Sequence, residues 1–227
     1  TALVLVAIAA GVLVVGGARP KHLAALVVVG ALGATFVLNS DMLADYQRDR
    51  LTNFLNQGEE ADLRGSAYNL ENSKIAIGAG GPFGRGLFNG SQTRLDNVPE
   101  QHTDFIFTAV GEELGFAGAG TLLALFGILV WRIWRTAQLA RDDFGSNVCV
   151  GVLCLLLFQG FENAGMTIGI MPITGITLPF VSYGGSSLLA NSVIVGLLIA
   201  LSVRNRDPLP PPRRQGRIRR LLDRGAA

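Results

Sequence analysis

Long runs of apolar residues dominate this chain, and one long polar stretch separates the first two runs from the other three. Each run is close to or above the roughly 20 residues that an α-helix needs to cross a hydrocarbon core of about 30 Å. The pattern therefore predicts an all-α, polytopic membrane protein with about five transmembrane helices and a large hydrophilic loop. The predicted helices are residues 1–18, 22–39, 105–131, 146–170 and 183–203.

The segments between these helices have patterns of their own. Residues 41–55 carry apolar positions at helical spacing and predict an amphipathic helix in the membrane interface. Residues 67–78 are half apolar and predict a short helix, which runs into the glycine-rich segment 78–90, a predicted loop. Residues 171–187 hold several Pro and Gly but are too apolar for a solvated loop, so we expect them to dip into the protein as a re-entrant segment.

The chain divides into two parts. Residues 1–203 form the predicted membrane part, which includes the loop 40–104, and residues 204–227 form a tail rich in Pro and Arg. We expect the tail to be disordered and to lie along anionic lipid headgroups. The sequence opens inside an apolar run, without an initiating Met or the charged start of a signal peptide, so we expect it to be the C-terminal part of a larger protein.

Composition agrees with a membrane protein. The chain is 49% hydrophobic and 16% charged, whereas soluble domains are about a quarter charged. The two cysteines, Cys149 and Cys154, lie five residues apart in one predicted helix and therefore on different faces, which argues against a disulfide or a metal site. The sequence has no Gly-x-Ser-x-Gly, HExxH or paired CxxC motif, so the common hydrolase and metalloprotein signatures suggest no function.

The distribution of basic residues predicts the orientation of the chain in the membrane. Of the 19 Lys and Arg, 13 lie between the first two helices, between the third and fourth, or after the fifth, and these three regions fall on one side. The other 6 lie in the loop 40–104, together with 10 acidic residues. We therefore predict that the loop 40–104 is extracytoplasmic and that the C-terminus is cytoplasmic.

Asp104 is the strongest catalytic candidate, because it stands directly before a predicted membrane helix. Partial removal from water at the membrane edge makes a carboxylate a better proton acceptor, so Asp104 is a candidate general base. The alternative is that Asp104 is the N-cap of the helix, and the two roles are compatible. Its neighbours His102 and Glu100 belong either to the same site or to an interfacial polar cluster.

The glycine-rich segment offers a second candidate site. Its backbone must come close to something, because so many glycines do not form the interior of a stable helix or strand. With Lys74, Arg85 and Arg94 nearby, bare N–H groups and cations would suit a phosphate. A flexible extracellular loop would have the same composition, and the segment is not a Walker A motif.

Acidic residues inside the predicted helices are a third signal, because an acid within a membrane is costly and is usually functional or paired. Glu112, Glu113 and Glu162 are such residues. They either contribute to a function or form buried structural contacts, for which Gln159 and Asn163 are candidate partners of Glu162.

A series of short motifs runs in order along the chain: Tyr46–Leu51, Asn72–Gly81, Gly84–Gly86, Gly90–Gln92, Pro99–Phe107, Gly111–Gly115, Asn163–Met166 and Pro179–Ser187. These motifs resemble the SEDS family of polytopic cell-wall proteins, and Lys74 with Gly90–Gln92 is closer to its RodA branch than to its FtsW branch. The resemblance covers nearly everything from Asp45 to Val203. It implies that the five predicted helices are the last five of a ten-helix fold.

The resemblance also implies an activity. The family is similar to a peptidoglycan glycosyltransferase that polymerises lipid II into undecaprenyl-linked glycan at the outer face of the bacterial cytoplasmic membrane, here for cell elongation. A class B penicillin-binding protein is the implied transpeptidase partner, and Asp104 maps onto the essential acid of an inverting reaction. The leaving pyrophosphate would be met by cations or by Mg²⁺ or Mn²⁺. Residues expected to contact the substrate are Arg48, Lys74, Arg85, Glu100, His102, Ser182 and Ser186.

Two other classes of function remain open from the residues alone. One is a flippase or transporter of a lipid-linked precursor, in which Glu112 and Glu162 relay protons or line a polar path. The other is a non-enzymatic scaffold that docks a penicillin-binding protein through its helices. The polymerase hypothesis alone requires the carboxylate of Asp104 for turnover.

Overall fold

The computed structural model describes residues 2–39, 66–94 and 101–206, and every regular element in these ranges is a helix. The prediction of an all-α chain is thus confirmed. The helices are α1 Ala2–Val15, α2 Pro20–Asn39, α4 Ser66–Gly80, α5 Ser91–Arg94, α6 Ile106–Gln138, α7 Asp143–Ile168 and α8 Gly185–Arg206.

The five predicted membrane helices correspond to α1, α2, α6, α7 and α8, whose ends differ from the predicted ones by up to seven residues. α6 continues seven residues beyond the predicted end at 131, because apolar and helix-favouring residues continue through Ala137. α8 continues to Arg206, so the predicted tail begins inside a helix. The short helix predicted at 67–78 is α4, which also takes in Gly80. The amphipathic helix predicted at 41–55 lies outside the described residues.

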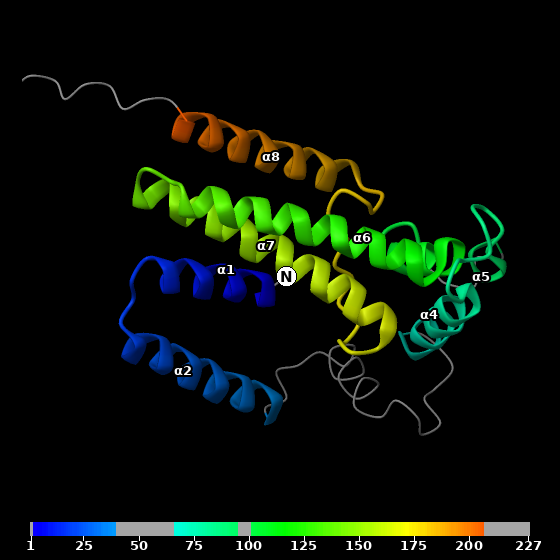
Figure 1. Ribbon diagram of the computed structural model, residues 1–227. Coiled ribbons are helices and arrows are strands. Elements are labelled where there is room, and N and C mark those ends of the chain that lie inside the picture. Colours follow the sequence, from blue (N-terminus) through cyan, green and yellow to red (C-terminus); the bar gives the residue numbers. More distant parts are fainter. Residues whose placement is uncertain (1, 40–65, 95–100, 207–227) are drawn as a thin grey trace, which may run out of the picture.

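α7 lies at the centre of the arrangement, with α1 packed on one side and α6 on another (Figure 1). α8 packs less closely against α6 and α7 than these two helices pack against each other. A buried apolar cluster joins the three helices, and its members are Ile133, Ala137, Cys149, Val150, Val152, Leu156 and Leu201. Cys149 and Cys154 are both free thiols.

The outward surfaces of the helices are strongly apolar. Val27, Leu189 and Val193 each expose 70% or more of their surface, which suits a hydrocarbon environment or further helices rather than water. α6, α7 and α8 are long and apolar enough to cross a membrane. The 14 residues of α1 rise only about 21 Å, so the count of five crossings remains a prediction.

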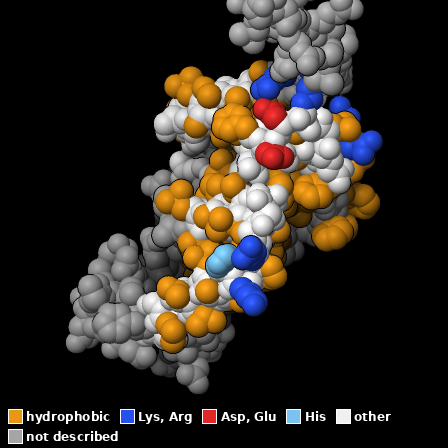
Figure 2. Space-filling view, turned by 90° about the vertical axis from the view of Figure 1, so that its left-hand side faces the viewer, with side chains coloured by type: hydrophobic (Ala, Val, Ile, Leu, Met, Phe, Trp, Pro, Cys, Tyr) orange, Lys and Arg blue, Asp and Glu red, His pale blue; other side chains and the backbone are white. Residues whose placement is uncertain are grey.

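The segments predicted to be cytoplasmic lie together at one end of the helix layer. They are the turn between α1 and α2, the turn between α6 and α7, and the end of α8, whereas α4 and α5 lie at the opposite end (Figure 1). Figure 2 looks onto the end that holds the two turns and the end of α8, and it shows Lys and Arg side chains on that end. The exposed basic residues of these segments include Arg19, Lys21, Arg141 and Arg204.

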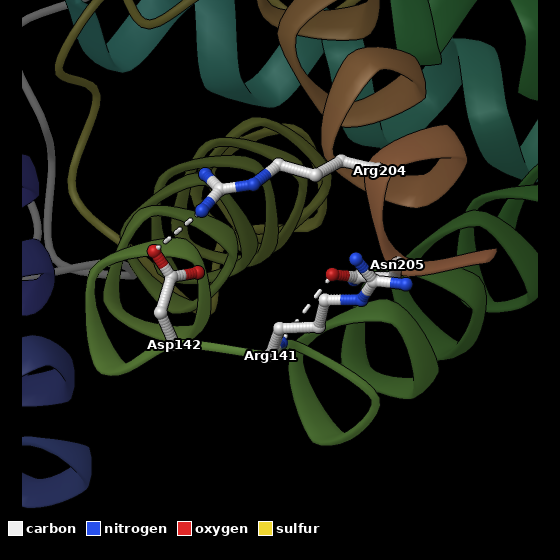
Figure 3. A network of polar contacts seen from close by, with 4 residues as sticks. All are labelled: Arg141, Asp142, Arg204 and Asn205. Carbon is white, nitrogen blue, oxygen red and sulfur yellow. Dashed lines mark hydrogen bonds and ion pairs between the residues drawn. The ribbon is translucent and has the colours of Figure 1, made fainter. Parts of the chain in front are cut away.

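A small polar network holds the end of α8 against the turn between α6 and α7 (Figure 3). The guanidinium of Arg204 forms an ion pair with the Asp142 carboxylate at 3.1 Å. The backbone N–H of Arg141 donates to the side-chain oxygen of Asn205 at 3.4 Å. The ion pair is exposed and therefore adds at most about 1 kcal/mol, so it fixes the position of the helix end more than it stabilises the fold.

Candidate active site

Three elements meet at the end of the molecule opposite the basic segments. They are the turn 101–105 that leads into α6, the last two turns of α7, and the extended segment 170–184 that connects α7 to α8. α7 ends at Gly169, whose left-handed φ of 83° closes the helix with a hydrogen bond from its N–H to the Gly165 carbonyl. The chain then continues without regular structure, and Leu178 and Pro179 are buried. The expectation that this segment is re-entrant within the membrane stays a prediction.

Asp104 is half-buried in the turn before α6. The side-chain amide of Asn163 donates to the Asp104 backbone carbonyl at 2.7 Å. On the other side, a Cβ placed on Gly175 would lie 3.0 Å from an oxygen of the Asp104 carboxylate. The carboxylate therefore lies next to a backbone position that has no side chain.

The N-cap interpretation of Asp104 is wrong. The helix begins at Ile106, and the N-cap position is taken by Phe105, which makes no side-chain cap hydrogen bond. At this end of the helix, the Thr108 N–H donates a hydrogen bond to the Phe105 carbonyl at 3.0 Å, which satisfies one of the first N–H groups of α6.

His102 and Ser182 line a pocket of about 530 Å³ beside this turn. His102 is exposed. Its backbone carbonyl accepts a hydrogen bond from the Tyr183 N–H at 2.9 Å. Ser182 accepts a hydrogen bond from the Leu178 N–H at 2.8 Å, which closes the turn before the pocket. The remaining lining is mostly apolar and consists of Ile106, Val181, Tyr183, Gly184, Gly185 and Leu188.

The pocket thus has a polar edge and an apolar wall, which suits a molecule that joins a polar group to a lipid chain. Ser186 lies in the first turn of α8 and is exposed, but it is not part of this lining. Of the residues expected to contact the substrate, the structure brings together His102 and Ser182, next to the turn that carries Asp104.

Lys74 lies on α4, half-buried, outside the pocket lining. Its neighbour Ser73 is completely buried and shares a hydrogen bond of 2.5 Å with the hydroxyl of Thr108, one turn after Asp104. The Ser73 hydroxyl also donates to the Thr167 carbonyl at 2.8 Å. α4 is therefore bound to the start of α6 and the end of α7, which brings the backbone of Lys74 to the periphery of the site.

Arg85 is exposed and is engaged elsewhere. Its guanidinium donates to the Ala79 carbonyl at 3.1 Å and to the Ser91 hydroxyl at 2.6 Å. Ser91 in turn donates to the carboxylate of Glu112 at 3.3 Å, and the Gln92 N–H donates to the same oxygen at 2.9 Å. Glu112 therefore holds the start of α5, so the buried acid has a structural partner.

The glycine-rich segment contacts the backbone of α6. α6 is interrupted at Gly115, whose φ of 66° and ψ of −165° lie in a region that is essentially restricted to glycine. Segment 81–86 fills the interruption. Two N–H groups after the break donate to its carbonyls, Phe116 to Gly81 at 2.9 Å and Ala117 to Pro82 at 3.0 Å.

The N–H groups of the same segment are also taken up by protein carbonyls. Arg85 donates to the Glu112 carbonyl and Gly86 to the Glu113 carbonyl, both at 3.0 Å. A Cβ on Gly84 would lie 2.1 Å from the Glu113 carbonyl oxygen. The glycines thus allow contact between two backbones, and a phosphate cradle would have to use other amides.

One buried polar residue of the site, Gln101, was not singled out from the sequence. Gln101 is buried, and within the described part of the chain neither atom of its side-chain amide has a partner. Asn163 and Glu162 reach the site from α7, and Thr174 donates to a Glu162 oxygen at 3.0 Å. The signal for Asn163 and Glu162 was the presence of polar residues within an apolar run, but the run did not indicate what they face.

Arg48 and Glu100 lie outside the described residues, so their predicted roles are untested. Among the residues that the structure describes, no group of three or more His, Cys, Asp or Glu is placed to hold a metal ion. A role of Mg²⁺ or Mn²⁺ at the leaving pyrophosphate stays a prediction.

Comparison with known proteins identifies relatives over most of the chain. The family model described as cell cycle protein, for FtsW, RodA and SpoVE, matches residues 1–207. Stage V sporulation protein E of Bacillus subtilis is 42% identical over 85% of this chain and 51% of its own length. The probable peptidoglycan glycosyltransferase FtsW of Geobacter metallireducens is 39% identical over 90% and 53%. The peptidoglycan glycosyltransferase MrdB of Escherichia coli K12 is 40% identical over 73% and 44%.

Among solved structures, the chain is similar to one from work on the structural coordination of polymerization and crosslinking by a peptidoglycan synthase complex. The TM-score is 0.71 at 30% identity, over 91% of this chain and 56% of the other. The chain spans about half the length of the curated relatives it matches. The identities to these relatives are similar, so they do not assign the chain to the RodA branch or to the FtsW branch. With its span-length helices, the chain is part of a multi-pass membrane protein.

Proposed function

This chain belongs to the FtsW, RodA and SpoVE family of cell cycle proteins, and on that premise we propose that the complete protein is a peptidoglycan glycosyltransferase that polymerises lipid II. The observation that supports this most is the half-buried carboxylate of Asp104 beside a pocket with a polar edge and an apolar wall. A lipid-linked sugar needs both kinds of surface. Two of the curated relatives carry peptidoglycan glycosyltransferase in their names.

The chemistry requires one base and a good leaving group. The 4-hydroxyl oxygen of the acceptor sugar attacks the anomeric carbon of the donor, and the bond from that carbon to the pyrophosphate oxygen breaks. The hydroxyl proton passes to Asp104, and the polyprenyl pyrophosphate leaves with the bonding electron pair. Attack on the face opposite the leaving group inverts the anomeric centre, and general-base catalysis of this kind contributes about 10²–10⁴-fold in rate.

The remaining assignments follow from the same proposal. His102 and Ser182 line the substrate pocket, and a contribution of Arg48, Lys74, Arg85, Glu100 and Ser186 to substrate binding is part of the same proposal. The protein acts at the outer face of the bacterial cytoplasmic membrane in cell elongation, together with a class B penicillin-binding protein. The membership of a similar chain in a peptidoglycan synthase complex supports a crosslinking partner. Polymerisation of labelled lipid II by the full-length protein with that partner tests the proposal.

Lys74 provides a test of pyrophosphate binding. Replacing Lys74 by methionine in the full-length protein should raise the apparent KM for lipid II about tenfold, because a charge-assisted hydrogen bond contributes roughly 1.5–3 kcal/mol. Arg48→Met should behave in the same way. A lipid II titration measures both constants, and Lys21→Met, at the opposite end of the molecule, is the matched control. Unchanged kinetics in both variants would assign the two cations to surface ion pairs.

The orientation of the protein has a direct test. After replacement of Cys149 and Cys154 by alanine, a cysteine at the exposed Asn89 should react with a membrane-impermeant maleimide in intact spheroplasts. A cysteine at the exposed Arg141 should react only after permeabilisation, because the basic end faces the cytoplasm. The reverse labelling pattern would overturn both the orientation and the assignment of an extracytoplasmic active site.

A further inference from the structure

Asn163 uses both hydrogens of its side-chain amide to bridge two separate parts of the site. It is completely buried on α7, six residues from Gly169. Its amide nitrogen donates to the Asp104 carbonyl at 2.7 Å and to the Ile176 carbonyl at 2.8 Å. Because two carbonyl oxygens face this atom, only a donor satisfies them, and the orientation of the amide is fixed chemically. A third element thus holds the Asp104 turn and the segment 170–184 together.

The adjacent residue on α7 strengthens this connection. Glu162 accepts a hydrogen bond from the Thr174 hydroxyl at 3.0 Å, so two successive residues of α7 hold Thr174 and Ile176. Gly175 lies between these two anchors, in a left-handed conformation with φ of 70°. A Cβ added to Gly175 would lie 3.0 Å from a carboxylate oxygen of Asp104. Asn163 therefore fixes the backbone that carries the carboxylate and helps fix the surface on which it rests.

From this geometry we propose that Asn163 is a positioning residue, which sets the place of the Asp104 carboxylate relative to the acceptor hydroxyl. The inference rests on the proposed function, because it assigns Asn163 a part in that reaction. Asn163 acts through the Asp104 backbone and does not touch the reacting atoms. An amide with a purely structural role would contribute to folding alone, and its loss would leave the turnover of the folded protein unchanged.

The test is a kinetic comparison in the full-length protein with its partner. Asn163→Ala should lower kcat for lipid II polymerisation about 10–100-fold, because misplacing a catalytic group by about 1 Å costs on the order of 10²-fold. The KM should stay close to its wild-type value, since the pocket lining is untouched. Asn163→Asp, which is similar in size but presents oxygens to both carbonyls, should be at least as slow.

Asn191→Ala is the matched control, because Asn191 is also a buried asparagine of a membrane helix, 7% exposed on α8, and lies outside the site. It should keep the wild-type kcat. A wild-type kcat in Asn163→Ala, or a raised KM at unchanged kcat, would overturn the proposal.

A second measurement separates this proposal from the function on which it rests. If the wild-type protein itself fails to polymerise lipid II, the proposed function falls, and hydrogen–deuterium exchange then decides whether Asn163 links the two segments. Peptides covering 101–105 and 174–178 should exchange faster in Asn163→Ala than in wild type or in Asn191→Ala. Unchanged exchange in both peptides would overturn the bridging role as well.

Discussion

Replacing Asp104 by asparagine is expected to abolish lipid II polymerisation by the full-length protein, with a loss of at least about 10²–10⁴-fold. Asparagine has nearly the same shape but no basic oxygen to accept the proton of the attacking hydroxyl. The contact with Asn163 is made by the Asp104 backbone, so the variant should keep the local structure. The measurement is glycan synthesis from labelled lipid II, with membrane insertion followed in parallel.

Asp142→Asn is the matched control for this experiment. Asp142 is an aspartate that precedes a long helix, as Asp104 does, but it lies in the turn between α6 and α7 and pairs with Arg204 on the surface. Its replacement should leave polymerisation near the wild-type rate, because an exposed ion pair contributes little to stability. Near-normal glycan synthesis by Asp104→Asn would reject Asp104 as the general base and, with it, the proposed mechanism.

Gly115→Ala is expected to destabilise the fold strongly. The new Cβ would lie 2.2 Å from the Gly84 nitrogen, and the backbone would stay in a conformation that alanine rarely adopts. Holding alanine in this backbone conformation alone costs about 1–3 kcal/mol, and the collision with segment 81–86 adds to that cost. We expect a clearly lower yield of folded protein and a lower Tm in detergent.

Gly120→Ala in the same helix is the control, because a Cβ at that position meets nothing within 4 Å. There the substitution should be neutral or should stabilise the helix by up to about 1 kcal/mol, since alanine favours helix more than glycine does. Equal Tm values for the two variants would show that segment 81–86 does not occupy the break in solution.

Much of the fold could be predicted because each membrane helix is a local feature of the sequence. A run of apolar residues predicts a helix wherever its neighbours lie, and α7 and α8 begin and end within a few residues of the predicted bounds. The interruption at Gly115 could not be predicted in this way. A glycine inside an apolar run is common in membrane helices, and only the backbone of segment 81–86, some 30 residues away, gives this one its conformation.

The site was predictable in part for the same reason. Asp104 and His102 stood out because they lie at the edge of an apolar run, which is a local signal. The partners of Asp104 are distant in sequence: Asn163 is 59 residues away, and Gly175 is farther still. Nothing in the composition around either residue indicates this contact. The glycine-rich segment was correctly expected to bring its backbone close to something, but the sequence did not reveal that its partner is α6.

The break in α6 also bears on how deep the Asp104 carboxylate, the proposed general base, lies in the membrane. A straight helix from Ile106 to Gln138 would rise about 48 Å. Asn163, which contacts the Asp104 backbone, lies only about 30 Å along α7 from Asp143. The first nine residues of α6 must therefore change direction at Gly115. Because 30 Å is also about the thickness of the hydrocarbon core, we expect the Asp104 carboxylate of the proposed glycosyltransferase to lie near the level of the phospholipid phosphates, where a polyprenyl pyrophosphate would present its sugar.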